Sequence, residues 1–171
     1  DGDNICDELE LEIAFILCEG AFGSNDGSLW GIKDNVIEEI DGNPTGNTAT
    51  SMAIHGNNLY VINNASGNIL KYTISEEGIV EQSTQIIDLN GTQPREIYII
   101  GNTAYVSQWT GDGIAVIDLD SFTLSTTIEV EGSTEGLTFD GTYLYATIPY
   151  SDYSTFTAGN SVVKIDLTSN S

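Results

Sequence analysis

The sequence predicts an all-β fold, a β-propeller of four-stranded antiparallel blades, because one strand-rich unit recurs along the chain. The clearest copy is Arg95–Gly132, where short runs of β-branched and aromatic residues alternate with turns of Gly, Asn, Asp and Ser. The hairpin Gly101–Val106 of this copy recurs as Gly56–Val61 and as Gly141–Ala146. A period of about 40–45 residues with four strands in each unit is typical of propeller blades.

Four strands are expected in this copy. In the last of them Leu124, Ile128 and Val130 alternate with polar residues, which predicts that these side chains share one buried face. The four expected strands are Ile97–Ile100, Ala104–Ser107, Ile114–Ile117 and Thr123–Val130.

The other units are expected on either side of it. The first starts partway through the four-strand pattern, with strands at Leu11–Leu17, Leu29–Ile32 and Asn35–Ile40. The second supplies Met52–Ile54, Leu59–Asn63, Ile69–Ile74 and Ile79–Ile87. The fourth carries a long second loop, Pro149–Asn160, which holds Tyr150, Tyr153 and Phe156. An acidic tether at residues 1–10 is expected before blades near residues 11–48, 49–92, 93–132 and 133–171.

The last run, Val162–Leu167, aligns with the third strand of a unit, so a fourth strand is expected beyond it. An unfinished sheet exposes an unpaired edge. The sequence therefore favours about four blades or part-blades from the front half of a longer propeller. The alternatives are that four blades close by themselves or that two copies pair.

The chain is strongly acidic, with 26 acidic and four basic residues and a formal net charge of −22. Such a charge repels phosphate backbones and anionic membranes, so nucleic-acid binding is not expected. It is common on exported, salt-tolerant proteins, and the acidic start resembles a tether left after a leader is removed. No apolar run is long enough to predict a membrane span.

The metal-binding and redox signals are weak. Cys6 and Cys18 permit a disulfide in an exported protein, and two independent thiols are the alternative. Asn25–Gly27 and Asp118–Asp120 could supply oxygen ligands to Ca²⁺, but turn formation explains them better. We therefore expect no cofactor. A Ser–His–Asp triad would have to use the single histidine, His55, and the sequence has no Gly-x-Ser-x-Gly elbow, so a triad is not expected.

Several motifs resemble a known family. The runs Leu59–Asn64 and Ala104–Ser107, followed by Ile114–Asp118, resemble the YVTN repeat of YncE-like β-propellers. The stretches Leu17–Leu29 and Ser51–Tyr60 resemble the YncE-like propeller lipoproteins of Bacteroidota. The resemblance implies a seven-bladed propeller, tethered by a lipid to the outer surface of the outer membrane. It also places the chain in the neighbourhood of the cobalamin-binding surface propellers that work with a TonB-dependent transporter.

A binding site is expected on one face of the propeller, where the loops between second and third strands meet the connectors between blades. Arg95, the only arginine, and aromatic residues with polar edges are the strongest candidates. The alternative is that Arg95 pairs with Glu96 or Glu135 while Trp109 packs on its own loop. The predicted ligand-binding residues are Asn63, Asn64, Arg95, Glu96, Gln108, Trp109, Glu135, Tyr150 and Tyr153.

The function that these features favour is a non-catalytic surface module. It would capture a small nutrient, such as a corrinoid, or dock on an outer-membrane transporter. Two alternatives remain: a propeller lyase or hydrolase, and a structural subunit of an envelope assembly. The expected location is outside the cytoplasm, on the outer-membrane surface or in the periplasm.

Overall fold

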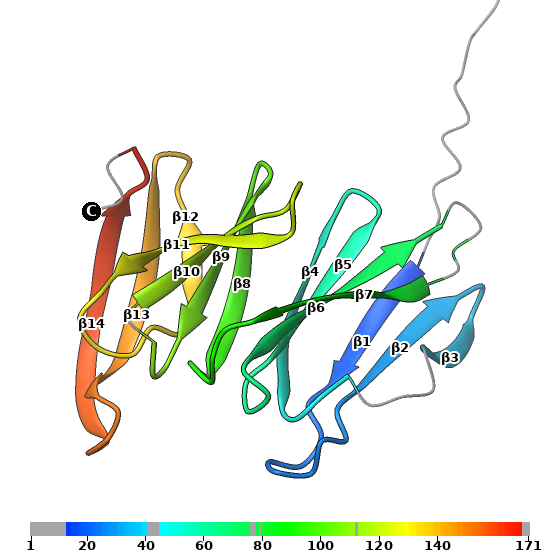
Figure 1. Ribbon diagram of the computed structural model, residues 1–171, viewed down its shortest axis with the longest axis horizontal. Coiled ribbons are helices and arrows are strands. Elements are labelled where there is room, and N and C mark those ends of the chain that lie inside the picture. The colour runs from blue at the N-terminus through cyan, green and yellow to red at the C-terminus, as the bar shows by residue number, and fades with distance from the viewer. Residues whose placement is uncertain (1–12, 41–44, 76–77, 79, 112, 169–171) are drawn as a thin grey trace, which may run out of the picture.

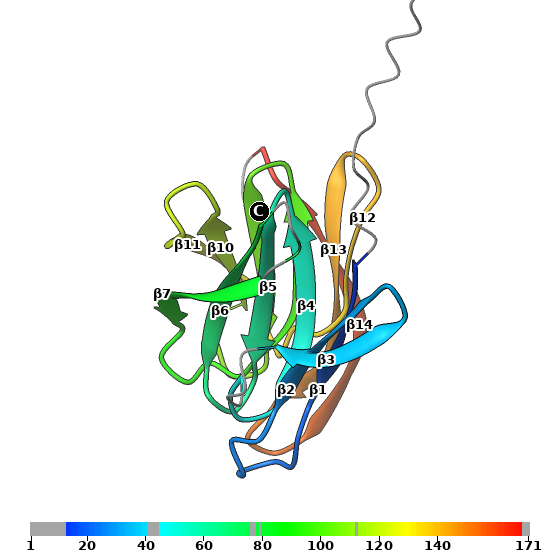
Figure 2. The same ribbon diagram turned by 90° about the vertical axis from the view of Figure 1, so that its right-hand side faces the viewer.

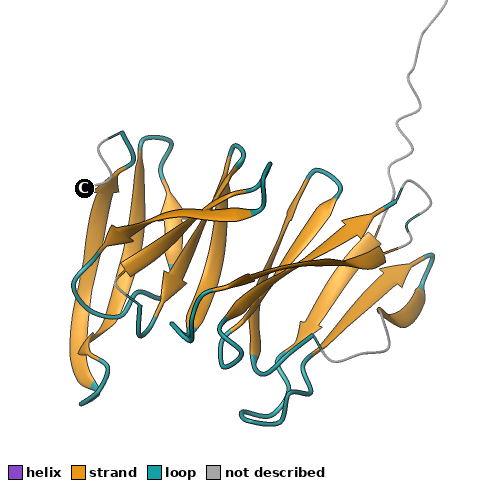
Figure 3. Cartoon of the chain, in the orientation of Figure 1, coloured by secondary structure: helices purple, strands orange, loops and turns teal. Residues whose placement is uncertain are grey.

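The computed structural model describes residues 13–40, 45–75, 78, 80–111 and 113–168, and these residues form fourteen β-strands and no helix (Figure 1 and Figure 3). None of the described residues therefore belongs to a helix suited to crossing a bilayer. The predicted fold class is confirmed, because consecutive antiparallel strands build separate sheets that stand side by side as part of a β-propeller.

Each sheet is a meander in which every strand pairs with the next one along the chain. Sheet 1 contains β1 (Ile13–Cys18), β2 (Ser28–Lys33) and β3 (Val36–Ile40). Sheet 2 contains β4 (Ala49–His55), β5 (Asn58–Asn63), β6 (Asn68–Ile74) and β7 (Val80–Asp88). Sheet 3 contains β8 (Pro94–Ile100), β9 (Thr103–Gln108), β10 (Gly113–Asp118) and β11 (Thr123–Glu129). Sheet 4 contains β12 (Leu137–Phe139), β13 (Tyr143–Asp152) and β14 (Thr157–Asp166).

Sheets 2, 3 and 4 are arranged around their first strands, since β8 contacts both β4 and β12 (Figure 1 and Figure 2). Tight hairpins such as that between β8 and β9 lie along the upper edge in Figure 1. The loops between β5 and β6, β9 and β10, and β13 and β14 lie along the lower edge. We call this lower edge, with the connectors that join successive sheets, the loop edge.

The first strand of sheet 1 corresponds to the second strand of the other sheets. The loop between β1 and β2 lies at the loop edge, where Glu19 O accepts a hydrogen bond of 3.2 Å from Ala49 N. That loop therefore occupies the place that the β5–β6 loop occupies in sheet 2, so β1 corresponds to β5 rather than to β4. This agrees with the expectation that the first unit starts partway through the four-strand pattern.

The second strand of a blade is buried on both sides, which explains its continuous apolar sequence. In β5, Leu59 and Val61 belong to the core between sheets 1 and 2. The alternate residues Tyr60 and Ile62 belong to the core between sheets 2 and 3. Successive side chains of a strand point to opposite faces, so one strand serves two cores. The Tyr60 ring also packs on Phe122 of sheet 3, with centroids 5.7 Å apart.

The predicted shared face of β11 is wrong at one position. The pairing shifts between Val116 and Ile117 of β10, whose partners are Thr126 and Leu124, so Ser125 is an extra residue. Such a bulge reverses the alternation beyond it. Ile128 is accordingly 2% exposed, whereas Leu124 is 43% exposed.

The predicted long loop Pro149–Asn160 is also wrong. The strands β13 and β14 continue to Asp152 and from Thr157, so only a short turn remains between them. Proline lacks the N–H that a ladder needs, and the pairing shifts between Ile148 and Tyr150, on either side of Pro149. This shift of register accommodates the proline, so the β13–β14 pairing continues beyond it.

Alkaline pH is expected to destabilise the core. Burial raises the pKa of Tyr60, with a smaller contribution from the Asp120 charge, and burial raises the pKa of Tyr105. A raised pKa means that the folded state favours the neutral phenol. The resulting stability is present below the unfolded pKa of about 10 and is lost as pH rises through the folded pKa. Urea midpoints measured from pH 8 to 11 should fall at the alkaline end, and less steeply for Tyr60→Phe. If the urea midpoint fell equally with pH in the wild type and in Tyr60→Phe, the assignment of this loss of stability to Tyr60 would be contradicted.

Candidate functional site

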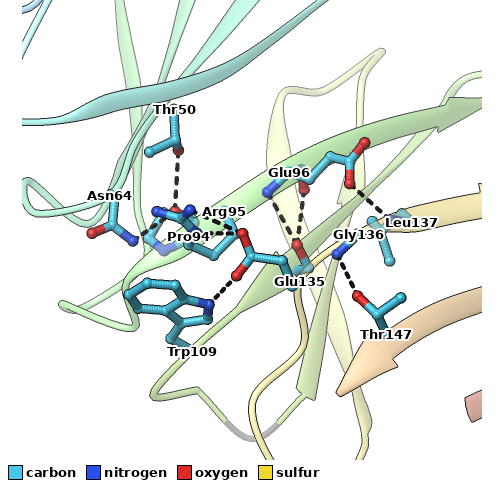
Figure 4. Close-up of polar contacts among 11 residues, drawn as sticks. Thr50, Asn64, Pro94, Arg95, Glu96, Trp109, Glu135, Gly136, Leu137 and Thr147 are labelled. Atoms are coloured by element: carbon cyan, nitrogen blue, oxygen red, sulfur yellow. Dashed lines mark hydrogen bonds and ion pairs between the residues drawn. The ribbon is translucent and has the colours of Figure 1, made fainter. Parts of the chain in front are cut away.

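Three of the predicted site residues meet at the loop edge and form one interacting unit (Figure 4). The Arg95 guanidinium donates to Glu135 Oε1 from Nε at 3.0 Å and from Nη2 at 2.9 Å. Its Cζ atom lies 4.1 Å from the centroid of the Trp109 ring, which is a cation–π contact. Trp109 Nε1 donates to the other Glu135 oxygen, Oε2. Glu135 therefore joins the arginine to the indole.

The fold brings these residues together from three segments far apart in the sequence. Arg95 lies near the start of β8, Trp109 follows the end of β9, and Glu135 lies in the connector that leads to β12. The connector is fixed to β9 because Thr134 N donates to Gln108 O at 2.9 Å. The start of β8 is fixed to sheet 2 because Asn64 Nδ2 donates to Pro94 O at 3.0 Å.

The unit remains accessible to solvent. The side chains of Arg95 and Glu135 are 22% and 34% exposed. The pairing of Arg95 with an acidic neighbour, which was the alternative to a ligand-binding role, is present in the structure, and the partner is Glu135. Glu96 is engaged elsewhere, because its Oε2 accepts a hydrogen bond of 2.8 Å from Leu137 N.

Trp109 packs on a neighbouring sheet, which differs from the alternative in which it packs on its own loop. Its ring centroid lies 6.0 Å from that of Tyr150 and 5.4 Å from that of Tyr153, both in the β13–β14 hairpin. Phe156 completes the cluster, 5.2 Å from Tyr153 and 5.7 Å from Tyr150. Phe156 was not among the predicted ligand-binding residues, although its spacing from Tyr150 and Tyr153 was a usable signal. The four rings are called the aromatic cluster below.

Three other predicted residues are buried and brace the backbone. Asn63 is 0% exposed, and its Nδ2 donates to Thr45 O at 3.0 Å. Gln108 is 3% exposed, and its Nε2 donates to Gly113 O at 3.2 Å. Asn64 is also 3% exposed. Their amides therefore hold the backbone of the loop edge from inside the protein and do not line its surface.

Two grooves flank the unit. The larger, of about 540 Å³, lies between β4 and the edge of β1 with which no described strand pairs, and it includes Thr50, Ser51 and Arg95 in its lining. The smaller, of about 380 Å³, lies between the loops of sheets 3 and 4 and includes Trp109 and Tyr153. The stacked Arg95 and Trp109 side chains therefore stand between two hollows of the loop edge.

The expected turn-forming role of the aspartates agrees with their contacts. Asp118 Oδ1 accepts hydrogen bonds from the N and Oγ atoms of Ser121, and these bonds lower the Asp118 pKa. Asp26 Oδ1 similarly accepts from Ala21 N at 2.8 Å. Across the described residues, no group of three or more His, Cys, Asp or Glu side chains is placed to hold a metal ion.

The remaining candidates lie away from this unit. Cys18 is exposed at the end of β1, whereas Cys6 falls outside the described residues, so their pairing stays a prediction. His55 lies at the opposite edge, where its Nε2 is 2.9 Å from Asn102 Oδ1.

Comparisons with known proteins support the fold. No protein-family model and no curated protein matches the chain. Among solved structures, hydrazine synthase of Kuenenia stuttgartiensis is 23% identical, with a TM-score of 0.67, over 84% of this chain and 41% of that one. A putative 6-phosphogluconolactonase of Bacteroides uniformis is 11% identical, with a TM-score of 0.67, over 92% and 51%. Another from Bacteroides fragilis is 17% identical, with a TM-score of 0.59, over 81% and 46%.

The chain thus spans about half or less of the length of these solved structures. At such low identity the similarity concerns the fold alone. Together with the sheet topology, it shows that the chain is part of a β-propeller whose neighbours include lactonase-like propellers.

Proposed function

We propose that this propeller is a non-catalytic binding module whose loop edge captures a small nutrient. The observation that carries the proposal is the unit of Arg95, Trp109 and Glu135, which joins two sheets between two grooves. Its side chains are held by mutual contacts before any ligand arrives. Binding to such a surface costs little additional ordering of side chains.

The chemistry of the loop edge favours binding over catalysis. The chain's single histidine, His55, lies at the opposite edge of the propeller. The aromatic cluster offers flat apolar surface with polar rims, which suits a large ring-containing ligand. A corrinoid is such a ligand, and it is the one that the resemblance to YncE-like surface propellers implies. The same resemblance supports a location on the outer-membrane surface, beside a transporter that would receive the nutrient.

The test is calorimetric titration of cyanocobalamin into the wild type and into Trp109→Ala and Arg95→Ala. We expect the wild type to bind and each variant to bind at least about tenfold more weakly, because central aromatic and arginine contacts dominate most binding surfaces. The control is His55→Ala at the opposite edge, which should bind as the wild type does. Circular dichroism should show that all four proteins are folded.

Two outcomes would overturn the proposal. Normal affinity in both Trp109→Ala and Arg95→Ala would exclude this part of the loop edge, and no binding by the wild type would exclude a corrinoid. A parallel assay with glucono-δ-lactone and 6-phosphogluconolactone addresses the alternative of a hydrolase, which the names of the lactonase-like structures suggest. Turnover that is lost in Trp109→Ala would replace the binding module with an enzyme.

A further inference from the structure

The smaller groove lies between the loop that follows β9 and the β13–β14 hairpin. It has a volume of about 380 Å³ and is lined on one side by Trp109, Thr110 and Gly111. The other side is supplied by the hairpin and by the connector from β11. Arg95 is not among the lining residues, so the groove is distinct from the one that Arg95 borders.

Aromatic rings form part of its wall. The centroids of Trp109 and Tyr153 lie 5.4 Å apart with an angle of 37° between the ring planes. Aromatic faces attract cations through their quadrupole, and quaternary ammonium groups are commonly bound by such walls. The Arg95 guanidinium stacks on one face of the Trp109 ring at 4.1 Å, so the ring accepts a cation but that face is closed to a ligand.

A carboxylate lies in the same groove. Asp152 is the last residue of β13, and its Oδ1 accepts hydrogen bonds from Ser154 N at 2.9 Å and from Ser154 Oγ at 2.7 Å. The Ser154 hydroxyl holds the pKa of Asp152 below its ordinary value, so the carboxylate is ionised at neutral pH. The net charge of −22 adds attraction for a cation and repulsion for an anion.

Three hydroxyl groups of the groove already donate to acceptors of the protein. Ser133 Oγ donates to Trp109 O at 2.7 Å, Thr110 Oγ1 donates to Gly91 O at 3.3 Å, and Ser154 Oγ donates to Asp152. These hydroxyls therefore present lone pairs to a ligand. A cation needs only acceptors and aromatic faces, and these hydroxyls add acceptors to the groove.

From these observations we infer that the groove between sheets 3 and 4 binds a small organic ammonium ion, with Trp109 and Tyr153 as the aromatic wall and Asp152 as the counter-charge. The inference does not rest on the proposed corrinoid function. The two proposals share Trp109 and Tyr153, but Arg95 enters only the first and Asp152 enters only the second, so variants at Arg95 and Asp152 distinguish them.

The test uses Trp30→Phe as the parent protein, which leaves Trp109 as the only tryptophan and hence the only fluorescent reporter of that kind. Choline is titrated first, followed by 3,3-dimethyl-1-butanol, its neutral isostere. We expect a saturable change in Trp109 emission with choline and at least about tenfold weaker binding of the alcohol. Raising the salt concentration should weaken choline binding, because the attraction is partly long-range.

The matched pair of variants is Asp152→Asn and Asp166→Asn in the same parent. Asp166 Oδ1 accepts hydrogen bonds of 2.9 and 2.7 Å from Thr168 N and Oγ1, which are the same lengths as those at Asp152, but it lies at the opposite end of β14 from the groove. Asp152→Asn should weaken choline about tenfold, and Asp166→Asn should not. Equal affinity for the alcohol, no effect of Asp152→Asn, or no saturation with choline would each overturn the inference. Because cyanocobalamin is measured separately, its failure to bind would leave this result unaffected.

Discussion

Replacing Tyr60 with alanine is expected to lower the free energy of unfolding by about 3–5 kcal/mol, the cost of deleting a large buried aromatic side chain. Tyr60 is 1% exposed and lies in the core between sheets 2 and 3. Its ring packs on Phe122, so the substitution also removes an aromatic pair across the interface. Urea unfolding followed by far-ultraviolet circular dichroism should show a lower midpoint with an unchanged slope.

The control for this change is Ile54→Ala on the neighbouring strand. Ile54 is 53% exposed, so its truncation should cost no more than about 0.5 kcal/mol. Equal losses for the two variants would show that the core between sheets 2 and 3 does not limit stability. The comparison matters for function because this interface sets where Arg95, in β8, stands relative to the groove beside β4.

Replacing Gly113 with alanine is expected to cost about 3 kcal/mol, from backbone strain and a disturbed ladder between β10 and β11. Gly113 has a φ of 131°, which side-chain-bearing residues rarely adopt, and a Cβ there would collide with Ile128 O. Its carbonyl also accepts hydrogen bonds of 3.2 Å from Gln108 Nε2 and from Thr134 Oγ1. The loop that carries Trp109 should therefore shift, and ligand binding should weaken with stability.

Gly101→Ala is the matched glycine variant. Gly101 has a φ of 57° in the β8–β9 turn, and a Cβ would meet nothing within 4 Å. Left-handed strain alone should cost about 1 kcal/mol. In thermal unfolding, the melting temperature should therefore be highest for the wild type, lower for Gly101→Ala and lowest for Gly113→Ala. Equal melting temperatures for the two variants would refute the steric contribution assigned to Gly113.

The sequence by itself determined the strands and their order. Runs such as Leu59–Asn63 and Ile114–Ile117 carry β-branched and aromatic residues between turn residues, and they appear as β5 and β10. These signals are local, because strand propensity and turn chemistry depend on adjacent residues. The repeat of the hairpin at Gly101 then identified the propeller. The bulge at Ser125 was missed, because a change of register depends on the partner strand.

The candidate site was only partly predictable for the same reason. The sequence pointed to Arg95, Trp109 and Glu135 as residues that differ between repeats, but it left the partner of Arg95 open. Tertiary structure decided in favour of Glu135, because the connector before β12 is fastened to the end of β9. It also turned Asn63 and Gln108 inward to satisfy buried backbone groups.

The grooves and the aromatic cluster are wholly tertiary features. Phe156 reaches Tyr150 and Tyr153 because the β13–β14 pairing continues past Pro149, where the sequence predicted a loop. The tyrosine rings of this cluster face Trp109 because sheets 3 and 4 pack side by side. Local sequence encodes which segments become strands, whereas a binding surface is made by side chains from different blades. The distances between these side chains depend on how the sheets pack against one another, and the sequence of a single repeat does not encode that packing.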